Sequence, residues 1–497
     1  MSASAGPTTP PAFSPTGTFV PGEPWSSGVR RSSDGALTVA GVDVRELAAA
    51  QGTPAYVLDE ADLRERARSY RRAFEAAFAE VGAGVDVYYA GKAFLSVAVA
   101  RWVYSEGLRV DTATGGELAV ALRAGVPGEH IGLHGNNKSD AEIARALDAG
   151  VGRIIVDSLV EIERVAAAAR ARGGAPAPVM IRVTTGVHAG GHEYISTAHE
   201  DQKFGLSLAT GGQVATAPGA RAPGATAPGA PGEDSPAMTA LLAVLAHPEL
   251  ELLGIHSHIG SQILDPSGFE VAARKVLELR AALAARTGYL VPEVDLGGGY
   301  GIAYLPGEVA LDPDRIAKDV AASVAASSAD LGTPLPRFSI EPGRAVVGPA
   351  GLTLYTVGTV KPVRVGGSAG DDEAEGTLVR TYVSIDGGMS DNIRPALYGA
   401  DYHAELANRL SDAEPVLARV VGKHCESGDI VVHDVLLPGD VRAGDLLAVA
   451  ATGAYGRSMA SNYNHVPRPP VVAVTDGETR VLVRRETVDD LLALDLG

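Results

Sequence analysis

Short runs of apolar and β-branched residues alternate with segments of helical composition through the middle of the chain. All but one of the intervals between these runs carry a plain helical segment, such as Ala93–Ser105 or Ser158–Arg172. Eight strands alternating with helices over roughly 250 residues predict an α/β fold, a (β/α)8 TIM-like barrel. The predicted strands are Val85–Ala90, Leu108–Asp111, Ile131–His134, Arg153–Val156, Val179–Val183, Leu250–His256, Glu293–Leu296 and Arg337–Ile340.

The exceptional interval lies between the fifth and sixth predicted strands. It contains a Pro/Ala/Gly tract at about residues 210–236. This composition cannot bury enough apolar area to order a chain, so the tract is predicted to be a disordered surface insertion.

Beyond Gly348 the pattern changes to short β-rich runs separated by Gly, Pro and Asp. Such runs are typical of a mostly antiparallel β domain. Gly366–Gly376 is predicted to be an exposed hairpin tip. The runs are Leu352–Val365, Leu378–Ile385, Ala418–Val421, Ile430–Leu437, Leu446–Val449 and Val471–Val474.

These patterns divide the chain into four parts. Residues 1–34 are predicted to be a disordered tail, and residues 35–54 a strand and helix that join the β domain. Residues 55–347 are assigned to the barrel and residues 348–497 to the C-terminal β domain.

Composition narrows the function classes. A length of 497 residues suggests two domains, and the net charge of -18 argues against nucleic acid, which needs clustered Lys and Arg. The single cysteine, Cys425, rules out an intramolecular disulfide and allows a cytoplasmic setting. The N-terminal stretch lacks the basic region and apolar core of a signal peptide, and no apolar run approaches a membrane span of roughly 20 residues.

The polar residues at the strand ends suggest chemistry, because barrel active sites lie at the carboxyl ends of the strands. Lys92 follows the first predicted strand, and a desolvated lysine there can act as an amine nucleophile and form a Schiff base. The alternative is a lysine that only marks the end of a strand. The other strand ends carry Asp111, His134, Asp157, Arg182, His258, Gly297–Gly299 and Glu341.

Several of these residues fit one cofactor. His258 can lie flat against an aromatic ring, and Ser261 can donate to a phosphate. The glycines Gly297, Gly298 and Gly299 let backbone N–H groups approach an anion. Taken singly, the histidine also fits a core position and the glycines a simple turn.

The eighth strand end completes the set. Glu341 can pair with a protonated pyridine nitrogen, and Arg344 can grip a phosphate or a carboxylate, although a structural salt bridge remains an alternative for either. Together these groups describe a pyridoxal 5'-phosphate (PLP) site with no metal.

Ten motifs in order carry a resemblance to a known family. Over roughly Gly35 to Leu491, without the Pro/Ala/Gly tract, the chain resembles the fold type III PLP-dependent decarboxylases, in their diaminopimelate decarboxylase branch. Phe94 departs from the asparagine of many relatives, which implies different contacts near Lys92. The motifs are YYAGKA, DTATGGEL, HGNNKS, KFGL, HSHIGSQ, DLGGGYG, EPGR, DGGMSDNIRPALYGA, CESGD and GAYG.

The resemblance implies roles for individual residues. Lys92 would hold PLP until the substrate amine displaces it, with Asp111 among the cofactor-binding residues. The substrate carboxylate would meet Arg344, Arg394 and Tyr398. Glu426 would bind the substrate ammonium, Cys425 (or alternatively Lys92) would return a proton, and Tyr455 would lie near phosphate and substrate.

The resemblance also implies an assembly and a reaction. A homodimer would share its active sites through the CESGD segment, with Lys203 supporting the interface. The implied reaction converts meso-2,6-diaminopimelate to L-lysine and CO2, the last step of lysine biosynthesis.

Three alternatives are weighed against that reaction. Decarboxylation of ornithine, arginine, lysine or carboxynorspermidine is disfavoured by Arg394 and Glu426. A racemase is disfavoured by Glu341, and a non-catalytic PLP carrier by the C-terminal β domain.

Overall fold

The computed structural model describes residues 22–187, 203–209, 234–365 and 378–497. It divides into two compact units. The barrel unit comprises Arg66–Gly301 and Leu311–Gly343, and the β unit comprises Met1–Glu65, Ile302–Ala310 and Arg344–Gly497. Each unit is described by itself.

Eight parallel strands close the barrel. Each pairs with the next, and β8 pairs with β9 to complete the ring, while the short β10 (Leu206–Ser207) adds to β9. The predicted (β/α)8 barrel is therefore confirmed. In ring order the strands are β9 (Ala177–Thr184), β11 (Leu250–Ser257), β12 (Glu293–Asp295), β13 (Arg337–Ile340), β5 (Val85–Ala90), β6 (Arg109–Thr112), β7 (Ile131–Leu133) and β8 (Arg153–Val156).

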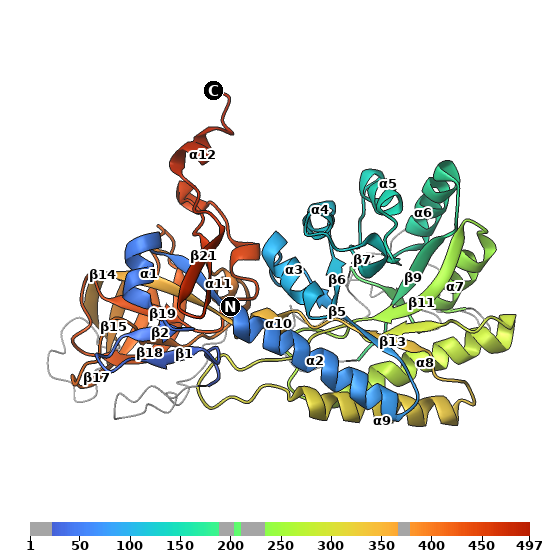
Figure 1. Cartoon of the computed structure of the whole chain (residues 1–497), viewed down its shortest axis with the longest axis horizontal. Helices are drawn as coiled ribbons and strands as arrows, with labels where there is room; N and C mark the ends of the chain where they lie inside the picture. The colour runs from blue at the N-terminus through green and yellow to red at the C-terminus, as the bar shows by residue number, and fades with distance from the viewer. Residues whose placement is uncertain (1–21, 188–202, 210–233, 366–377) are drawn as a thin grey trace, which may run out of the picture. The chain divides into compact units, whose positions relative to one another are not determined.

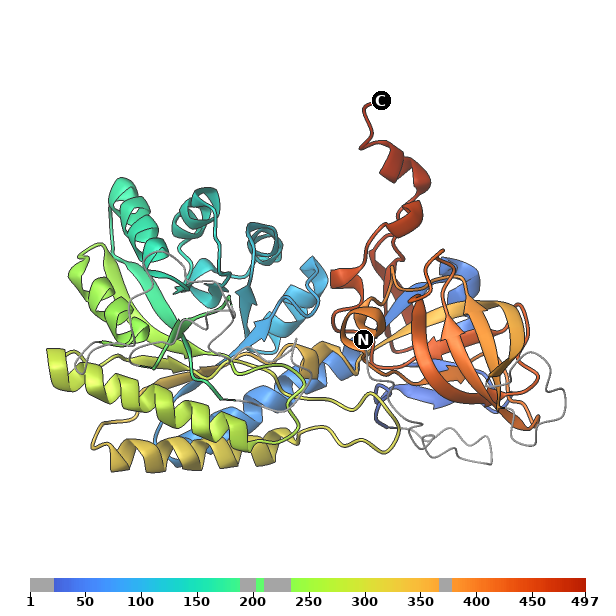
Figure 2. The same cartoon turned by 180° about the vertical axis from the view of Figure 1, so that it is seen from behind.

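Helices surround these strands in both views (Figures 1 and 2). Most begin at a Ser, Thr or Asp whose side chain accepts a backbone N–H of the first turn, as Ser139 does in the capping box of α5. The helices are α2 (Glu60–Glu80), α3 (Val97–Ser105), α4 (Gly115–Arg123), α5 (Asp140–Ala149), α6 (Leu159–Arg172), α7 (Pro236–Ala246), α8 (Ser267–Thr287) and α9 (Pro313–Asp330).

The β unit is built on a second, mostly antiparallel sheet. Its main path runs β18-β17-β15-β14-β4-β20-β21, with β19 paired to β14 and β16 paired to β19. The pairs β15–β17 and β4–β20 are parallel. The strands are β4 (Ala55–Asp59), β14 (Gly351–Val365), β15 (Leu378–Ile385), β16 (Ala404–Leu406), β17 (Pro415–Val421), β18 (Ile430–Pro438), β19 (Leu446–Val449), β20 (Val471–Thr475) and β21 (Glu478–Val483).

A small N-terminal sheet packs onto the same core. Its strands β1 (Val29–Arg31), β2 (Leu37–Val39) and β3 (Val42–Asp43) lead into α1 (Val44–Gln51). Both views show this N-terminal segment beside the C-terminal strands (Figures 1 and 2). Three short helices, α10 (Arg344–Val347), α11 (Arg394–Tyr398) and α12 (Val488–Leu492), complete the unit.

Two predicted boundaries are wrong. The predicted disordered tail, residues 1–34, extends too far, because Trp25 is buried in the β-unit core and Val29 begins β1. The predicted start of the barrel at residue 55 is also too early, because β4 lies between β14 and β20 in the β-unit sheet. A strand's partners are set by residues far along the chain, so its own sequence does not reveal its sheet.

Two other predictions fall outside the described residues. Most of the Pro/Ala/Gly insertion does, although its last residue, Pro236, already begins α7 with Ser235 as the cap. The predicted hairpin tip also does, although β14 and β15 pair up to Val365 and Leu378 on either side of it. Among the described residues, no helix has both the length and the apolar character that crossing a bilayer requires.

Candidate active site

Lys92 lies just beyond β5, at the carboxyl end of the barrel strands, as predicted. Its side chain is exposed, so the predicted desolvation is wrong for the single chain. Its charge still reaches the neighbouring strand ends, where it lowers the pKa of His258 and opposes the raised pKa of Asp111. The predicted departure at Phe94 stays a prediction, because the 2.6 Å hydrogen bond from the Tyr89 hydroxyl reaches the Phe94 backbone carbonyl oxygen and does not depend on the Phe94 side chain.

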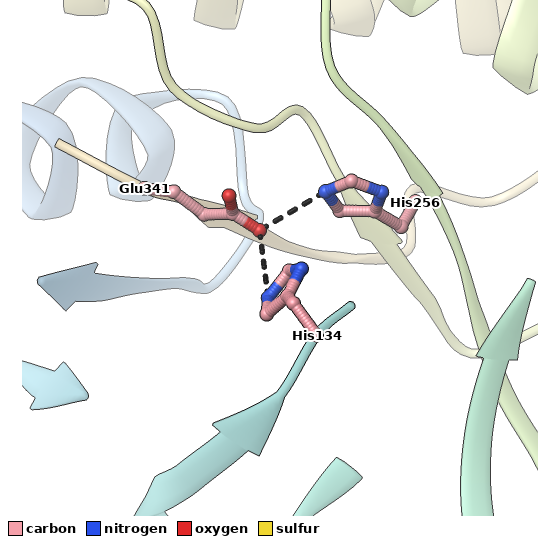
Figure 3. A group of neighbouring side chains, drawn as sticks. All are labelled: His134, His256 and Glu341. Carbon is pink, nitrogen blue, oxygen red and sulfur yellow. Dashed lines mark ion pairs between the residues drawn. The ribbon is translucent and has the colours of Figure 1, made fainter. Parts of the chain in front are cut away.

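Two histidines from different strand ends converge on one carboxylate oxygen of a third residue, Glu341. Glu341 Oε1 lies 3.1 Å from His256 Nε2 and 3.3 Å from His134 Nε2 (Figure 3). Burial lowers the pKa of both histidines to about 3, so both rings are neutral at pH 7. These atoms lie within 4.8 Å of one another, a spacing that a divalent cation also accepts, so the absence of a metal stays a prediction.

A fully buried arginine lies beside this cluster inside the barrel. Arg153 pairs with Asp295 at 2.7 Å and with Asp111 at 3.4 Å, and it donates to the Ser339 hydroxyl at 2.7 Å. Its guanidinium carbon lies 3.5 Å from the centre of the Tyr88 ring. Burial raises the pKa of Asp111 to about 7, although the charge of Arg153 opposes the shift.

The glycine run after β12 is built for close backbone approach. A Cβ on Gly298 would lie 2.1 Å from the Glu341 carbonyl oxygen, and one on Gly299 would lie 2.4 Å from the Gly260 carbonyl oxygen. Two of its amides are already used within the chain, since Gly297 N donates to Asp295 Oδ1 at 2.7 Å and Gly298 N to His258 Nδ1 at 3.1 Å. The prediction that these glycines bind the cofactor stays a prediction, because these bonds show only that two of the N–H groups have partners within the chain.

The bond from Gly298 also orients His258. Because Nδ1 accepts that hydrogen bond, the proton of the neutral ring lies on Nε2. Burial lowers the pKa of His258 well below its ordinary value, and the charge of Lys92 lowers it further. The buried ring is thus neutral and fixed at the strand ends, and Ser261, three residues further along the chain, is half-buried.

The barrel site has buried polar atoms without aligned hydrogen-bond partners in the described part of the chain, and these atoms fit the polar groups of PLP. Within the described residues, Glu341 Oε1, Asp111 Oδ2 and both ring nitrogens of His256 are buried without an aligned hydrogen-bond partner. Such atoms are costly to leave unpaired, so they indicate a polar ligand. A protonated pyridine nitrogen is the donor that an acceptor such as Glu341 lacks.

The β unit carries a different cluster, of arginines and tyrosines. Arg344 donates to the Tyr304 hydroxyl and Arg394 to the Tyr402 hydroxyl. The Arg394 guanidinium lies 4.7 Å from the Tyr304 ring centre, and that of Arg344 lies 4.7 Å from the Tyr455 ring centre. Among the described residues, no carboxylate lies within ion-pair distance of the buried Arg394.

These arginines change the tyrosines around them. Burial alone would raise the pKa of Tyr304, but the charges of Arg344 and Arg394 lower it below its ordinary value. Tyr402 keeps a pKa raised by burial to about 12. Tyr455 is held at a positive φ of 60°, a conformation that a non-glycine residue rarely adopts and that often marks a functional loop.

The remaining predicted site residues lie on the surface of the β unit. Cys425 and Glu426 are exposed on the loop between β17 and β18. Tyr398 is half-buried at the end of α11, the helix that begins with Arg394.

Sequence reasoning assigned no role to several residues of these clusters. Arg153 is predicted only as the start of a strand, and His256 only as the end of a strand and part of a motif. A charged residue inside a barrel strand is a signal that could have singled out Arg153. Tyr304 and Tyr402 offered no such signal, because only the fold brings them to Arg344 and Arg394.

Comparison with known proteins agrees with this geometry. Residues 60–220 and 231–348 match the family of pyridoxal-dependent decarboxylases, pyridoxal binding domain. The chain is 50% identical over 479 residues to diaminopimelate decarboxylase of Mycobacterium tuberculosis, which covers 95% of this chain and 97% of that protein. It is 42% identical over 467 residues to the enzyme of Bacillus subtilis, covering 94% of this chain and 97% of that one.

Solved structures show the same relationship. Diaminopimelate decarboxylase of M. jannaschii in complex with L-lysine superposes with a TM-score of 0.80 at 30% identity, covering 95% of this chain and 98% of that one. The Helicobacter pylori enzyme complexed with L-lysine gives a TM-score of 0.75 at 28% identity, covering 91% of this chain and 99% of that one. With two relatives above 40% identity over nearly its whole length, this chain belongs to the diaminopimelate decarboxylase family of pyridoxal-dependent decarboxylases.

Proposed function

We propose that this chain catalyses the PLP-dependent decarboxylation of meso-2,6-diaminopimelate to L-lysine and CO2, the last step of lysine biosynthesis. The observation that carries the proposal is the 50% identity to a diaminopimelate decarboxylase over 95% of the chain. Two relatives were solved with L-lysine bound, which is the proposed product.

The barrel unit supplies the groups that hold the cofactor. When bound, PLP supplies an electron sink for the pair left behind by the departing CO2. Lys92 would hold the aldehyde end, and the fixed, neutral ring of His258 would lie against the face of the pyridine ring. Glu341 would accept the hydrogen bond of the ring nitrogen and keep the proton there, with His134 and His256 beside it as neutral neighbours.

The residue that holds Asp111 differs from the residues proposed to bind the phosphate group of PLP. Asp111 is held by Arg153 at the end of β6, within the electrostatic reach of Lys92. Ser261, Gly299 and Tyr455 are proposed phosphate-binding groups, with Gly297 and Gly298 shaping the loop through their internal hydrogen bonds.

The β unit supplies the groups that recognise the substrate. Arg394 is a buried cation without a carboxylate partner among the described residues, so a substrate carboxylate would form the ion pair that the chain does not supply. Arg344 and Tyr398 are proposed to bind the same carboxylate and Glu426 the distal ammonium. A substrate that lacks the second carboxylate would leave Arg394 unmatched, which disfavours lysine, ornithine, arginine and carboxynorspermidine.

Cys425 is proposed to return a proton to the carbon that loses CO2. Its exposure on the surface of one chain agrees with action at a site shared with a second copy, so we propose a homodimer with shared active sites. Lys203, whose ammonium lies 4.8 Å from the Phe204 ring centre, is proposed to support that interface. With one cysteine and hence no internal disulfide, a cytoplasmic location is proposed.

The test is CO2 release from the purified protein with PLP. meso-Diaminopimelate, L-lysine, L-ornithine and L-arginine are offered in parallel, beside a Lys92→Ala variant as control. Release from diaminopimelate alone, and its loss in the control, is the expected result. Release from ornithine or arginine instead would overturn the roles of Arg394 and Glu426, while stereochemical inversion without CO2 would indicate a racemase.

A further inference from the structure

The loop that carries Cys425 and Glu426 combines an exposed tip with buried anchors. Its tip, Cys425–Gly428, reaches solvent, whereas the flanking residues His424 and Asp429 are buried. We call residues Gly422–Asp429 the tip loop. Exposed loop residues are commonly mobile, so a buried anchor on each side of the tip calls for an explanation.

The Asp429 carboxylate closes the tip loop onto a second loop. Its Oδ2 accepts the His424 backbone N–H at 2.8 Å, and its Oδ1 accepts the Met389 backbone N–H at 2.5 Å. Two further backbone bonds close the base, from Gly422 N to Asp429 O at 2.9 Å and from Lys423 N to Gly387 O at 3.0 Å. Both carboxylate oxygens are therefore used to hold backbone.

The space around that carboxylate admits no other side chain. A Cβ on Gly422 would lie 2.2 Å from Asp429 Oδ2, and a Cβ on Gly388 would lie 2.5 Å from Asp429 Oδ1. Glycine at both positions lets the two loops close around the carboxylate.

The other anchor, His424, is held through both ring nitrogens. Nε2 lies 2.8 Å from the buried Ser390 hydroxyl, and Nδ1 lies 3.1 Å from Asn464 Oδ1. The Tyr463 ring centre is 5.3 Å from that of His424. Because Asn464 Oδ1 only accepts, Nδ1 carries a proton, and the Ser390 hydroxyl that contacts Nε2 also donates to Asp391 Oδ1 at 3.3 Å. The imidazole is thus fixed in orientation, directly before Cys425.

We propose that Asp429 and His424 are positioning residues that hold the tip in the one conformation in which Cys425 and Glu426 act on the substrate. This inference rests on the roles proposed for Cys425 and Glu426. A proton donor and an ammonium ligand must be placed to within a fraction of an ångström, and an exposed loop without such anchors does not provide that precision.

The test uses the full-length PLP-loaded protein and the isosteric variant Asp429→Asn. An amide presents only one acceptor oxygen, so one of the two backbone N–H groups loses its partner. We expect hydrogen–deuterium exchange of the tip loop to rise about tenfold, and kcat to fall about 10- to 100-fold with PLP content and dimer mass unchanged.

Two further variants separate positioning from simple damage. Ser390→Ala removes the partner of His424 Nε2 together with a longer hydrogen bond, 3.3 Å, from Ser390 to Asp391 Oδ1, and it should raise tip-loop exchange and lower kcat by smaller factors, about threefold. Asp440→Asn is the control, because the exposed Asp440 accepts from Ser411 and Arg409 instead of the tip loop, and it should change neither quantity.

The proposal is overturned if Asp429→Asn raises exchange but leaves kcat/KM within about twofold of wild type, or if it changes neither. Should Asp429→Asn not fold, unchanged exchange and kcat in Ser390→Ala would overturn it equally. A wild-type protein that releases no CO2 from diaminopimelate would overturn the proposed function, and faster exchange in Asp429→Asn would still support the anchoring.

Discussion

Arg153 of the barrel unit and Arg394 of the β unit are buried in opposite ways. In the barrel unit, Arg153 is surrounded by the carboxylates of Asp295 and Asp111. In the β unit, Arg394 has a tyrosine hydroxyl and two aromatic rings around it and, among the described residues, no carboxylate. A buried charge is normally paired, so the first arrangement is complete as it stands and the second is complete only with an anion.

The difference separates a structural cation from a ligand-binding one. The pair partners of Arg153 come from the chain and are present in every state of the protein. The pair partner of Arg394 must come from a bound ligand. This explains why tyrosines line the site, because they stabilise the cation without cancelling its charge. The following predictions test this distinction, from the largest expected effect to the smallest.

Replacing the unpaired arginine should affect catalysis most. In Arg394→Met, kcat/KM for diaminopimelate should fall about 100- to 1000-fold, because removing a charged, hydrogen-bonded partner of a carboxylate typically costs ~3–4 kcal/mol. Steady-state kinetics measure the effect, and urea unfolding should show little change. Arg419→Met, which removes an arginine already paired with Asp434, is the control. A large loss of stability with kcat/KM intact would contradict the distinction.

Replacing the paired arginine should affect stability most. In Arg153→Met, Asp111 and Asp295 are left as buried, uncompensated carboxylates, which should lower the free energy of unfolding by ~3–5 kcal/mol. Urea denaturation measures this, with Arg172→Met as the control, because the Arg172–Asp148 pair is solvent-exposed and should contribute at most ~1 kcal/mol. Equal effects in the two variants would show that Arg153 is not the structural cation described.

A pH series should reveal one buried aspartate in each unit. Burial raises the pKa of Asp111 and of Asp391 to about 7, from an ordinary value of 3.8. Because the folded state then binds more protons than the unfolded state, stability falls as pH rises from about 4 to about 7. The slope is at most ~1.4 kcal/mol per pH unit for each group.

Single variants assign that slope to the two units. Asp111→Asn and Asp391→Asn should each flatten the dependence of the unfolding free energy on pH between 4 and 7. Asp265→Asn should not, because the pKa of that exposed carboxyl is lowered by its hydrogen bonds to Ser267 and so titrates below the window. An unchanged slope in both buried variants would contradict the raised pKa values.

Removing the Pro/Ala/Gly tract should have the smallest effect. Deletion of Gly211–Asp234 is expected to leave kcat/KM within about twofold of wild type. The family match supports this prediction, because it skips residues 221–230. Size-exclusion chromatography and the CO2 assay check it, and loss of folding or of the proposed dimer would refute it.

The elements buried on both faces were the most predictable from sequence. The bounds of β5, β8 and β13 agree with the predicted runs, since a strand covered on both sides is mostly apolar, although each of the three carries a polar residue such as Asp86, Arg153 or Ser339. The same rule placed Lys92, His258 and Glu341 at strand ends.

What depends on distant partners could not be predicted. β4 has the same apolar pattern as the barrel strands, and only its pairing with β14 and β20 assigns it to the other sheet. The exposure of Lys92 and the internal use of the Gly297 and Gly298 amides likewise depend on groups elsewhere in the chain.

The position of β4 has a consequence for the order of folding. Residues 55–59 leave the ribosome well before their partners in β14 and β20, which are made some 300 and 400 residues later. Until then the strand is an unpaired, apolar edge that other chains can join. Synthesis of this protein therefore passes through a long interval in which β4 is open to aggregation, and chaperones that cover such edges should raise its yield.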